Sequence, residues 1–473
     1  MYKLPLALIL VSFVMNGHGD EYQTSPMLGD SLNRTITIAE EERIGRNIYK
    51  ALQKNNNIVN DVFVSDYITY LGNKLSRNTS YNRNYVFFVT RSKSVNAFAL
   101  PGGYIGFNSG LITLTQNEAQ LAGVVAHELA HVVLRHSAEM IARSNVNSIP
   151  MWIGIFAGLL AGQTEASIAS IKSGIGLSVQ QNINLVRENE IEADIFAARL
   201  MQNSNYALIE MAKFFRLMQG DANSQSYLNE YFMTHPLYSN RISTIENKGR
   251  QQSGAIINST NDYEYIKNIL MSSEKTSQAI NKKANNSSVI NHRLALNYLK
   301  AGNYDKARQT IQENYDSNNY NIYISSLMAD IHWAMGEKIE SRNIIKKLLE
   351  IYPDNNAINF QLLKQNIKDS FNLDKSVLEL KDFAKKNNNN PTIYKLLAEG
   401  SEKIGDKYGT KLALINFYNL KGNLPMAYRI IDDSVKSNYL SDIQKKNLLS
   451  IKNRILCNSN PPLEPVFGPK TCN

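Results

Sequence analysis

The stretch VVAHELAHVVLRHS, from Val124 to Ser137, decides how the rest of this 473-residue chain is interpreted. It holds three of the chain's seven histidines, and a glutamate directly follows the first of them. Apolar residues on both sides of HELAH predict a helix from Asn117 to His136 that is buried on most of its surface. Two solvated histidines on an ordinary helix are the alternative. Because buried histidines need polar partners, the apolar surroundings favour a polar centre.

On such a helix, His127 and His131 lie four residues apart and project from one face. Two imidazoles at this spacing can bind one zinc ion, and Glu128, about 100° round the helix from His127, lies beside the metal. A carboxylate there suits a general base that takes a proton from a zinc-bound water. His136 lies about 140° round the helix from His131, so we expect it to face away and, like Arg135, to be structural.

A catalytic zinc site needs a third protein ligand and an open fourth position. The spacing that would recruit a later histidine of the same stretch is absent. A second helix, predicted over Val186–Leu200, offers acids instead, because Glu190 and Asp194 lie four residues apart and share a face. We expect Glu190 to reach the metal and Asp194 to accept a hydrogen bond from the far nitrogen of a ligating histidine. Glu188 and Glu192 are typical of a solvated face.

The segments before the central helix mix helical and extended patterns. A long helix is predicted over Ala39–Lys54, and the run YVFFVT over Tyr85–Thr90 is typical of a strand. Pro101 and the two glycines after it mark a turn between alternating, extended segments. These signals predict an α+β fold that is mostly α, with a small sheet in the domain that holds the HELAH motif.

A 34-residue period begins after residue 290. Gly302 and Gly336 are 34 residues apart, and a small residue follows each of them five positions later. This period is typical of tetratricopeptide repeats, whose helical pairs stack into an all-α solenoid. The next step reaches Ser370, where the copy is weak, and Gly422 repeats the layout out of phase.

Composition limits the classes of function. Hydrophobic residues make up 43% of the chain, charged residues 20%, and the net charge is +9. These values are typical of a soluble globular protein, and with no dense Lys/Arg run they do not indicate a nucleic-acid partner. The predicted organisation is a signal peptide (1–19), a metalloprotease domain (20–262), a linker (263–290), the repeats (291–450) and a C-terminal tail (451–473).

Three further features concern export and membranes. The apolar run Leu4–Met15 has the length of a signal-peptide core and predicts a cleaved export signal, the alternative being an uncleaved anchor. Cys457 and Cys472 are the only cysteines, and in an exported chain they predict one disulfide rather than two unrelated thiols. The run Ile149–Gly162 is too short to span a bilayer. It predicts buried core helices or a surface that touches membrane or unfolded substrate.

The motifs taken together resemble a known family. HELAHVVLRHS, followed by ENEIEAD some sixty residues later, with NAFALPGG before and THPLYSNRI after, is similar to the gluzincin family of prenyl-protein and heat-shock membrane proteases. The export signal and the repeats resemble the exported members that act in outer-membrane β-barrel assembly. The resemblance implies one zinc ion per chain, with His127, His131 and Glu190 as ligands and Glu128 as base.

The resemblance also implies roles outside the two helices. It places a substrate-pairing edge strand at Asn96, Ala97, Phe98 and Ala99, and an open edge can take up a peptide as an extra strand. It places His235 close to the zinc, where the imidazole either fills the fourth position as a latch or donates to the oxyanion of the transition state. Arg241 is a similar candidate for a catalytic role.

Two functions remain open at this stage. One is an exported, periplasmic zinc endopeptidase that removes unfolded or stalled outer-membrane proteins, with the repeats docking the assembly machinery. The other is a repeat-based chaperone or binding module with a latent zinc site. Because a structural zinc site needs no base, Glu128 favours the enzyme.

Overall fold

The computed structural model describes most of the chain, in segments. The described residues are 36–79, 84–143, 179–221, 231, 235–237, 239–253, 259–272 and 287–457. The predicted signal peptide, the apolar run Ile149–Gly162 and Cys472 lie outside them. Cys457 lies at the end of the last described helix.

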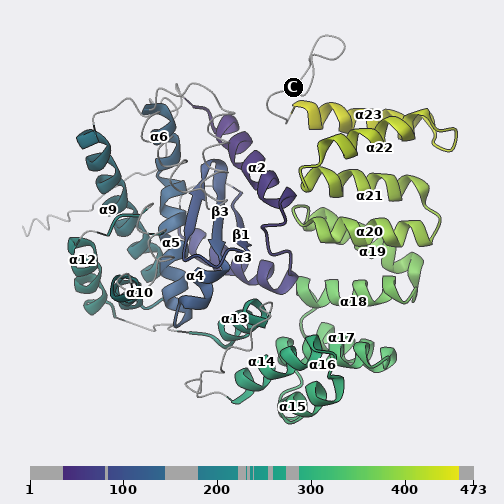
Figure 1. The fold of residues 1–473 in the computed structure, drawn as a ribbon, viewed down its shortest axis with the longest axis horizontal. Helices are drawn as coiled ribbons and strands as arrows, with labels where there is room; N and C mark the ends of the chain where they lie inside the picture. The colour runs from purple at the N-terminus through teal and green to yellow at the C-terminus, as the bar shows by residue number, and fades with distance from the viewer. Residues whose placement is uncertain are drawn as a thin grey trace, which may run out of the picture.

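The N-terminal part is built around a small mixed sheet (Figure 1). Helices α2 (Ile38–Lys54) and α3 (Val62–Ser76) precede three strands, β1 (Val86–Thr90), β2 (Ala97–Leu100) and β3 (Tyr104–Asn108). The strand order is β1-β3-β2, with β3 parallel to β1 and antiparallel to β2. The helix expected over Ala39–Lys54 and the strand expected over Tyr85–Thr90 are therefore confirmed.

The turn between β2 and β3 needs its glycines. It forms a short 3-10 segment, η1 (Pro101–Gly103), against which α2 packs. Gly102 has φ 76° and a Cβ there would lie 2.4 Å from the backbone of Glu42, so only glycine fits both the angle and the space. The turn thus fixes α2 against η1 and β3.

The central helix α5 (Glu118–Val133) carries the HELAH motif and is buried along its whole length. The side chain of Asn117 caps its first turn by accepting a hydrogen bond from the N–H of Gln120. Glu118, at the positive end of the helix dipole, accepts hydrogen bonds from the hydroxyls of Tyr67 and Tyr206. The apolar runs around HELAH predict a helix that is buried on most of its surface, and α5 is such a helix.

Among the described residues, five further helices surround α5 and the sheet. They are α4 (Ser109–Leu114), α6 (His136–Arg143), α9 (Val179–Asn203), α10 (Leu208–Asp221) and α12 (Ser239–Arg250). Helices α9 and α10 pack directly against α5, and α12 packs against both of them. The helix predicted over Val186–Leu200 thus lies within α9, next to the HELAH motif.

The C-terminal part is a curved stack of helices that begins below the sheet and rises past α2 (Figure 1). Its elements are α13 (Asn261–Ser272), α14 (Ser287–Lys300), α15 (Tyr304–Ser317), α16 (Ile322–Ala334), α17 (Lys338–Ile351), α18 (Asn356–Lys368), α19 (Leu373–Lys386), α20 (Pro391–Lys403), α21 (Lys407–Leu420), α22 (Leu424–Lys436) and α23 (Asp442–Cys457). Helices that follow one another in the chain pack together along the stack. The predicted fold class, mostly α with a small sheet and a helical C-terminal region, is confirmed.

The turns of the stack follow the predicted period. Gly302 and Gly336 join helix pairs in the left-handed conformation, with φ of 79° and 85°. Ser370, at the weak third copy, adopts φ 55° in the same kind of turn. Glycine is the residue that such a turn favours, and because serine stands in its place this copy is hard to recognise from its sequence.

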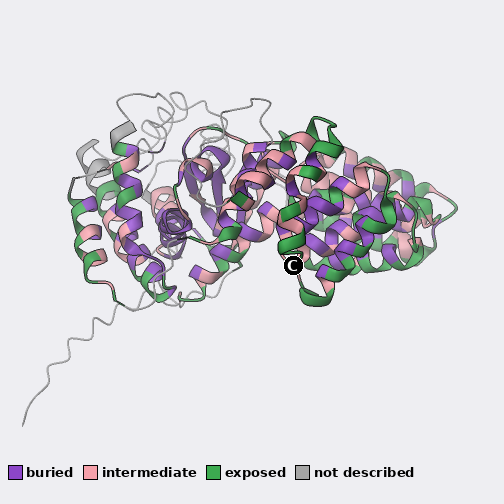
Figure 2. Ribbon diagram, turned by 90° about the horizontal axis from the view of Figure 1, so that it is seen from below, coloured by how far each residue is buried: buried purple, intermediate pink, exposed green. Residues whose placement is uncertain are grey.

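The two parts share a core. One cluster of buried apolar residues runs from the sheet and α5 through α10 into α13–α17, and buried residues line the inner sides of the helices in both parts (Figure 2). Helix α13 lies in the region predicted as a linker, yet Tyr263 and Tyr265 are buried there. Among the described residues, no helix combines the length and apolar character that a membrane crossing requires.

Candidate metal centre

The end of α5 differs from the prediction in a way that matters for the site. The predicted helix continues to His136, whereas α5 ends at Val133 and Arg135 adopts a left-handed φ of 59°. The guanidinium of Arg135 is buried and donates to the carboxylate of Glu41 at 2.9 Å and to the carbonyl of Ile36 at 3.1 Å. These contacts with α2 and the segment before it hold the turn that ends α5.

This turn overturns the prediction that His136 faces away. The chain swings His136 back, so that its Nδ1 lies 2.8 Å from Nδ1 of His131. Its Nε2 lies 3.4 Å from a carboxylate oxygen of Glu192 on α9. The prediction was wrong because it assumed an unbroken helix, and helical angles do not apply across a left-handed residue.

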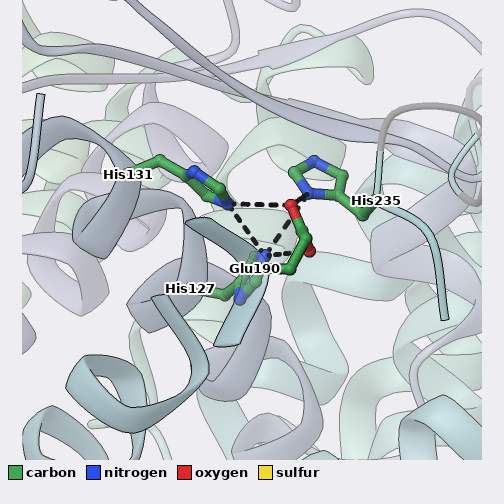
Figure 3. Close-up of side chains that lie close together, drawn as sticks. All are labelled: His127, His131, Glu190 and His235. Atoms are coloured by element: carbon green, nitrogen blue, oxygen red, sulfur yellow. Dashed lines mark hydrogen bonds and ion pairs between the residues drawn. The ribbon is translucent and has the colours of Figure 1, made fainter. Parts of the chain in front are cut away.

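Four side chains from three segments converge where the C-terminal half of α5 meets the middle of α9 (Figure 3). His127 and His131 come from α5 and Glu190 from α9, while His235 precedes α12. One possible ligand atom from each lies within 4.8 Å of the others. All four residues are buried, so the three imidazole rings and the carboxylate are closed off from bulk water.

The distances within the cluster suit a small metal ion. Nε2 of His127 lies 3.1 Å from Nε2 of His131 and 3.3 Å from Oε2 of Glu190. Nδ1 of His235 lies 3.0 Å from Oε1 of Glu190 and 3.3 Å from Nε2 of His127. Tetrahedral zinc bonds of about 2.0–2.2 Å place donor atoms roughly 3.4 Å apart, and the nitrogen and oxygen donors are of the type that zinc takes. The residues present therefore fit the ion that the sequence implies.

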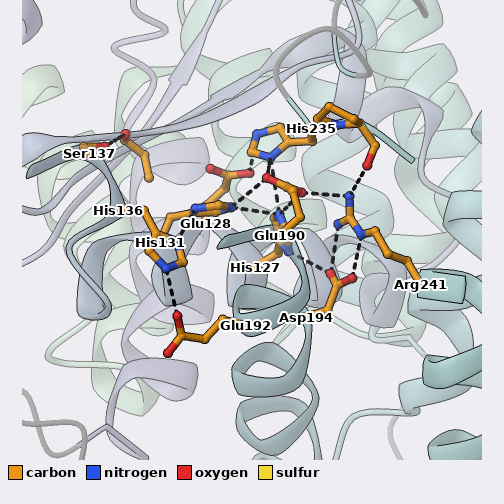
Figure 4. A network of polar contacts seen from close by, with 12 residues as sticks. His127, Glu128, His131, His136, Ser137, Glu190, Glu192, Asp194, His235 and Arg241 are labelled. Carbon is orange, nitrogen blue, oxygen red and sulfur yellow. Dashed lines mark hydrogen bonds and ion pairs between the residues drawn. The ribbon is translucent and has the colours of Figure 1, made fainter. Parts of the chain in front are cut away.

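Asp194 and Arg241 support the cluster from one side (Figure 4). Oδ1 of Asp194 lies 3.1 Å from Nδ1 of His127, the ring atom opposite the cluster. Arg241 donates from Nε and Nη2 to both oxygens of Asp194, at 2.6 and 2.9 Å, and lies 2.7 Å from Oε2 of Glu190. Asp194 thus lies where the sequence places it. Arg241, a candidate for transition-state contact, is buried with its guanidinium on these two carboxylates, which favours an orienting role.

Glu128 is the buried carboxylate whose hydrogen bonds are missing. It is 0% exposed, and neither of its oxygens has a hydrogen-bond partner among the described residues. Nε2 of His235 lies 3.4 Å from Oε1 of Glu128. Burial raises the pKa of Glu128, although the neighbouring histidines oppose it. A carboxylate held in this state is prepared to take a proton from a group that enters the cluster.

The ionisable groups of the cluster are strongly coupled. Burial opposes ionisation of Glu190, but His235 and His127 outweigh it and hold the pKa of that carboxyl well below its ordinary value. Burial lowers the pKa of His127, yet Glu190 and Asp194 outweigh it and raise the pKa to about 10. At His131 burial also lowers the pKa. The contacts with Glu190 raise it too little to offset burial, and the pKa falls to about 3. Glu190 is therefore the anion around which the cluster is organised.

Two contacts near the cluster were not predicted from the sequence. If Nε2 of His131 binds a metal, the proton of this ring is on Nδ1, which then donates to Nδ1 of His136. The proton of His136 is in turn on Nε2, which points to Glu192. Glu192, predicted as a solvated acid, is 59% exposed but ends this chain of contacts. Tyr231, which no motif indicates, packs its ring on that of His235, with centroids 4.8 Å apart.

The predicted substrate strand forms one edge of the sheet. Ala97, Phe98 and Ala99 belong to β2, an edge strand, and Asn96 directly precedes it. The N–H of Asn108 in β3 donates to the carbonyl of Asn96. In an antiparallel ladder alternate residues face the partner strand, so the backbone groups of Ala97 and Ala99 point outward. Ser137 already donates to the carbonyl of Ala99, at 3.1 Å.

Comparison with known proteins identifies the domain that contains the cluster. Residues 65–248 match the family model of peptidase family M48. This part of the chain is therefore similar to the M48 peptidases. The matched range includes the two helices of the cluster, the edge strand β2 and His235. Similarity to a metalloprotease is what the motifs predict.

The relatives extend this similarity along the chain. The β-barrel assembly-enhancing protease of Escherichia coli O157:H7 is 25% identical over 457 residues, which cover 93% of each chain. The putative β-barrel assembly-enhancing protease of Vibrio cholerae serotype O1 is 34% identical over 230 residues, 48% of this chain and 47% of the relative. The mitochondrial metalloendopeptidase OMA1 of Schizosaccharomyces pombe is 30% identical over 158 residues, 33% of this chain. The resemblance stated from the motifs is confirmed, and it includes the helical C-terminal part.

Proposed function

We propose that this chain is an exported zinc endopeptidase that acts on outer-membrane β-barrel proteins during their assembly. His127, His131 and Glu190 would hold the ion, and a bound zinc ion would lower the pKa of a water molecule and polarise the scissile carbonyl. The β-barrel substrate class comes from the names of the bacterial relatives. The remaining steps follow from this chain's own residues.

The observation that carries the proposal is the state of Glu128. A structural metal site has no use for a fully buried carboxylate without hydrogen-bond partners, and such a group destabilises the fold. In a peptidase the same group is the general base. Glu128 takes a proton from the attacking water and delivers it to the leaving amine, and its raised pKa brings it closer to the value that proton transfer near neutral pH requires.

The substrate would lie along β2. An extended peptide can pair with the outward backbone groups of Ala97 and Ala99 as an added strand, which selects for extended conformation with little regard to sequence. Unfolded or stalled β-barrel proteins offer such segments. Because Ser137 donates to the carbonyl of Ala99, a substrate that uses this acceptor must share it with Ser137 or displace Ser137.

His235 supports a latent resting state. Its Nδ1 lies among the donor atoms of the cluster, at the place where an open catalytic site would admit water. We propose that His235 is a latch that must move before cleavage. The competing role, donation to the oxyanion, requires the ring to face the substrate carbonyl instead.

The cellular setting follows from the same relatives and from the sequence. We propose export to the periplasm with cleavage of residues 1–19, and a disulfide between Cys457 and Cys472. The helical stack would be a tetratricopeptide-repeat array that docks substrates or the outer-membrane assembly machinery. A repeat-based chaperone with a latent centre is the second candidate, favoured by the position of His235.

The Glu128→Gln variant tests the enzyme. Zinc content should remain at one ion per chain, while cleavage of an unfolded β-barrel substrate falls to the background rate. Glu188→Gln, at an exposed position of α9, is the matched control and should cleave like the wild type. Cleavage by Glu128→Gln at the wild-type rate would contradict the proposed base. The inactive variant can then capture substrates in the cell envelope.

The His235→Ala variant tests the latch. A latch predicts faster basal cleavage together with weaker zinc binding, because a fourth donor is lost. An oxyanion donor predicts slower cleavage with unchanged zinc affinity. His332→Ala, in helix α16 of the stack, controls for the loss of an imidazole far from the centre. Slower cleavage at full zinc occupancy would eliminate the latch.

A further inference from the structure

The turn after α5 connects the metal centre with the edge strand. Its three consecutive residues, Arg135–Ser137, each contact a different part of the domain, and we call them the bracket. The first binds α2, the second lies against a proposed metal ligand on α5, and the third binds β2. The positions of groups from α2, α5 and β2 therefore depend on one short segment of backbone.

The first residue of the bracket is held in an unfavourable state. Arg135 has a φ of 59°, and for a residue with a Cβ this left-handed region is less favourable than the right-handed one. Its guanidinium and the carboxylate of Glu41 are 1% and 4% exposed, and two charges withdrawn from water gain little net stability from each other. Both features occur beside a metal ligand, which indicates a role in geometry rather than in stability.

The partner of Arg135 is itself fixed. Glu41 lies on α2, whose backbone at Glu41 and Glu42 packs so closely on Gly102 that a Cβ there would lie 2.4 Å from Cα of Glu42. Gly102 belongs to η1, which directly follows β2. The first turn of α2 thus contacts both the turn that ends β2 and the turn that ends α5. Arg135 also donates to the carbonyl of Ile36, just before α2, at 3.1 Å.

The other two residues of the bracket reach the metal centre and the edge strand. Nδ1 of His136 lies 2.8 Å from Nδ1 of His131, whose Nε2 faces the cluster (Figure 4). Ser137 donates to the carbonyl of Ala99 at 3.1 Å, a group on the side of β2 where an added strand would pair. Because the two residues are adjacent, a change in the backbone at Arg135 displaces both.

The contacts of the bracket form a closed ring. Helix α2 packs on η1, η1 follows β2, Ser137 binds β2, and Arg135 binds α2. In a closed ring no member can shift without breaking another contact, so the ring fixes the distance between β2 and the end of α5. A peptide paired with β2 needs this distance, because a displacement of about 1 Å at a reacting group costs up to 100-fold in rate.

We propose that Arg135 is a positioning residue. Held by Glu41, it sets the bracket that orients His131 for the metal and keeps β2 at the distance that cleavage requires. Arg135 lies outside the cluster and acts through His136 and Ser137. The part that concerns β2 rests on the proposed endopeptidase function, whereas the part that concerns His131 does not.

Arg135→Gly tests this role, because glycine adopts the left-handed turn freely and the variant loses only the side chain. The affinity for zinc, measured by competition with a chelator, should fall about tenfold, the low end for an outer partner of a ligating histidine. At saturating zinc, KM for an unfolded β-barrel substrate should rise roughly two- to fivefold, the value of one neutral hydrogen bond. The kcat should change less, because Glu128 and the ligands remain.

Substitution of the other two bracket residues separates the two effects. At saturating zinc, Ser137→Ala should raise KM without changing zinc affinity, and His136→Ala should lower zinc affinity without changing KM. Arg135→Gly should do both, which a merely structural arginine would not. Arg342→Met removes a buried arginine that pairs with Asp369 in the stack. It is the matched control and should leave both values unchanged.

A double variant distinguishes positioning from stabilisation. Glu41→Leu combined with Arg135→Met replaces the ion pair by apolar side chains, an exchange that often preserves or raises stability, and denaturant unfolding checks the fold. If the pair only stabilised the chain, this variant would have the zinc affinity and KM of the wild type. We expect both defects of Arg135→Gly to persist in it.

The outcomes for the bracket and for the proposed function are separate. Wild-type zinc affinity or wild-type KM in both Arg135→Gly and the double variant would overturn the positioning role. If no protein, wild type included, cleaved the substrate, the proposed function would fail, and the zinc affinities would still decide whether Arg135 positions His131.

Discussion

The metal centre and the junction of α13 with α14 both bury imidazoles, but they surround them with different side chains. At the centre, His127 lies against the carboxylates of Glu190 and Asp194, at 3.3 and 3.1 Å. At the junction, His292 of α14 is 2% exposed and packs edge-on against the ring of Tyr265, with centroids 4.9 Å apart. Its Nδ1 has no hydrogen-bond partner among the described residues.

The pKa values of these two histidines shift in opposite directions. Burial alone lowers the pKa of His292 to about 3. At His127 burial also lowers the pKa, but the two carboxylates outweigh it and raise the pKa to about 10. Burial by itself therefore does not mark a functional histidine. Surrounding carboxylates mark a functional histidine, because they attract a cation to the place where the ring nitrogen points.

The largest effect should come from removing the carboxylate that organises the centre. Glu190→Gln takes away a ligand and the charge that raises the pKa of His127. Zinc affinity should fall by more than the roughly 10–100-fold that outer-shell partners contribute, and cleavage should be lost with it. Competition with a zinc chelator measures the affinity, and Glu188→Gln on the same helix is the control. If Glu190→Gln retained wild-type zinc affinity, the centre would be organised by other groups.

A smaller effect is expected at Asp194, which supports His127 without reaching the cluster. Asp194→Asn keeps the shape but removes the charge beside Nδ1 and one partner of Arg241. Zinc affinity should fall roughly 10–100-fold. Excess zinc should then restore most of the cleavage rate, since the ligands and Glu128 remain. Failure of excess zinc to restore activity would show that Asp194 does more than orient His127.

The sequence predicts the parts of the centre that depend on helix geometry. His127 with His131, and Glu190 with Asp194, are each four residues apart, and α5 and α9 place each pair on one face as expected. The place of His136 could not be predicted, because it depends on the left-handed turn at Arg135, which Glu41 holds from 94 positions away in the chain. Contacts over such distances leave no periodic trace in a sequence.

The same limit applies to the fold. The 34-residue period predicts the turns at Gly302 and Gly336, because glycine is the residue that such turns favour. It gives only a weak signal at Ser370, where the structure accepts a left-handed serine. Nothing local in the sequence indicates that α13 would bury Tyr263 and Tyr265 between the two parts, since burial there is decided by packing with α3, α4 and α14.

His136 should contribute less than Asp194, because its far partner Glu192 is largely solvated. His136→Ala removes the acceptor for Nδ1 of His131, and we expect a loss of zinc affinity of about tenfold, the low end for outer-shell partners. His136→Asn, whose amide oxygen can accept the same proton, should recover part of the loss. The chelator competition used for Glu190 measures both variants. Equal affinities of wild type and His136→Ala would show that His131 needs no orienting partner.

The smallest effect should appear at the junction, as a dependence of stability on pH. The pKa of His292 is about 3 in the folded chain, against an ordinary value of 6.5 that applies when the chain is unfolded. Below pH 6.5 the unfolded chain therefore binds a proton that the folded chain does not, so stability falls as the pH decreases from 6.5 towards 3 and is unaffected above 6.5. By linkage, this site removes about 2 kcal/mol between roughly pH 7.5 and pH 5.

His292→Leu isolates that contribution, because leucine fills the buried position without titrating. Chemical denaturation at about pH 7.5 and pH 5 should show that the wild type loses about 2 kcal/mol more than the variant between the two conditions. His332→Leu in α16, whose ring pairs with Glu337, controls for the removal of a histidine that has a carboxylate partner. If wild type and His292→Leu lost the same stability, the folded chain would accommodate the proton. The contrast between partnered and unpartnered imidazoles would then not hold at this junction.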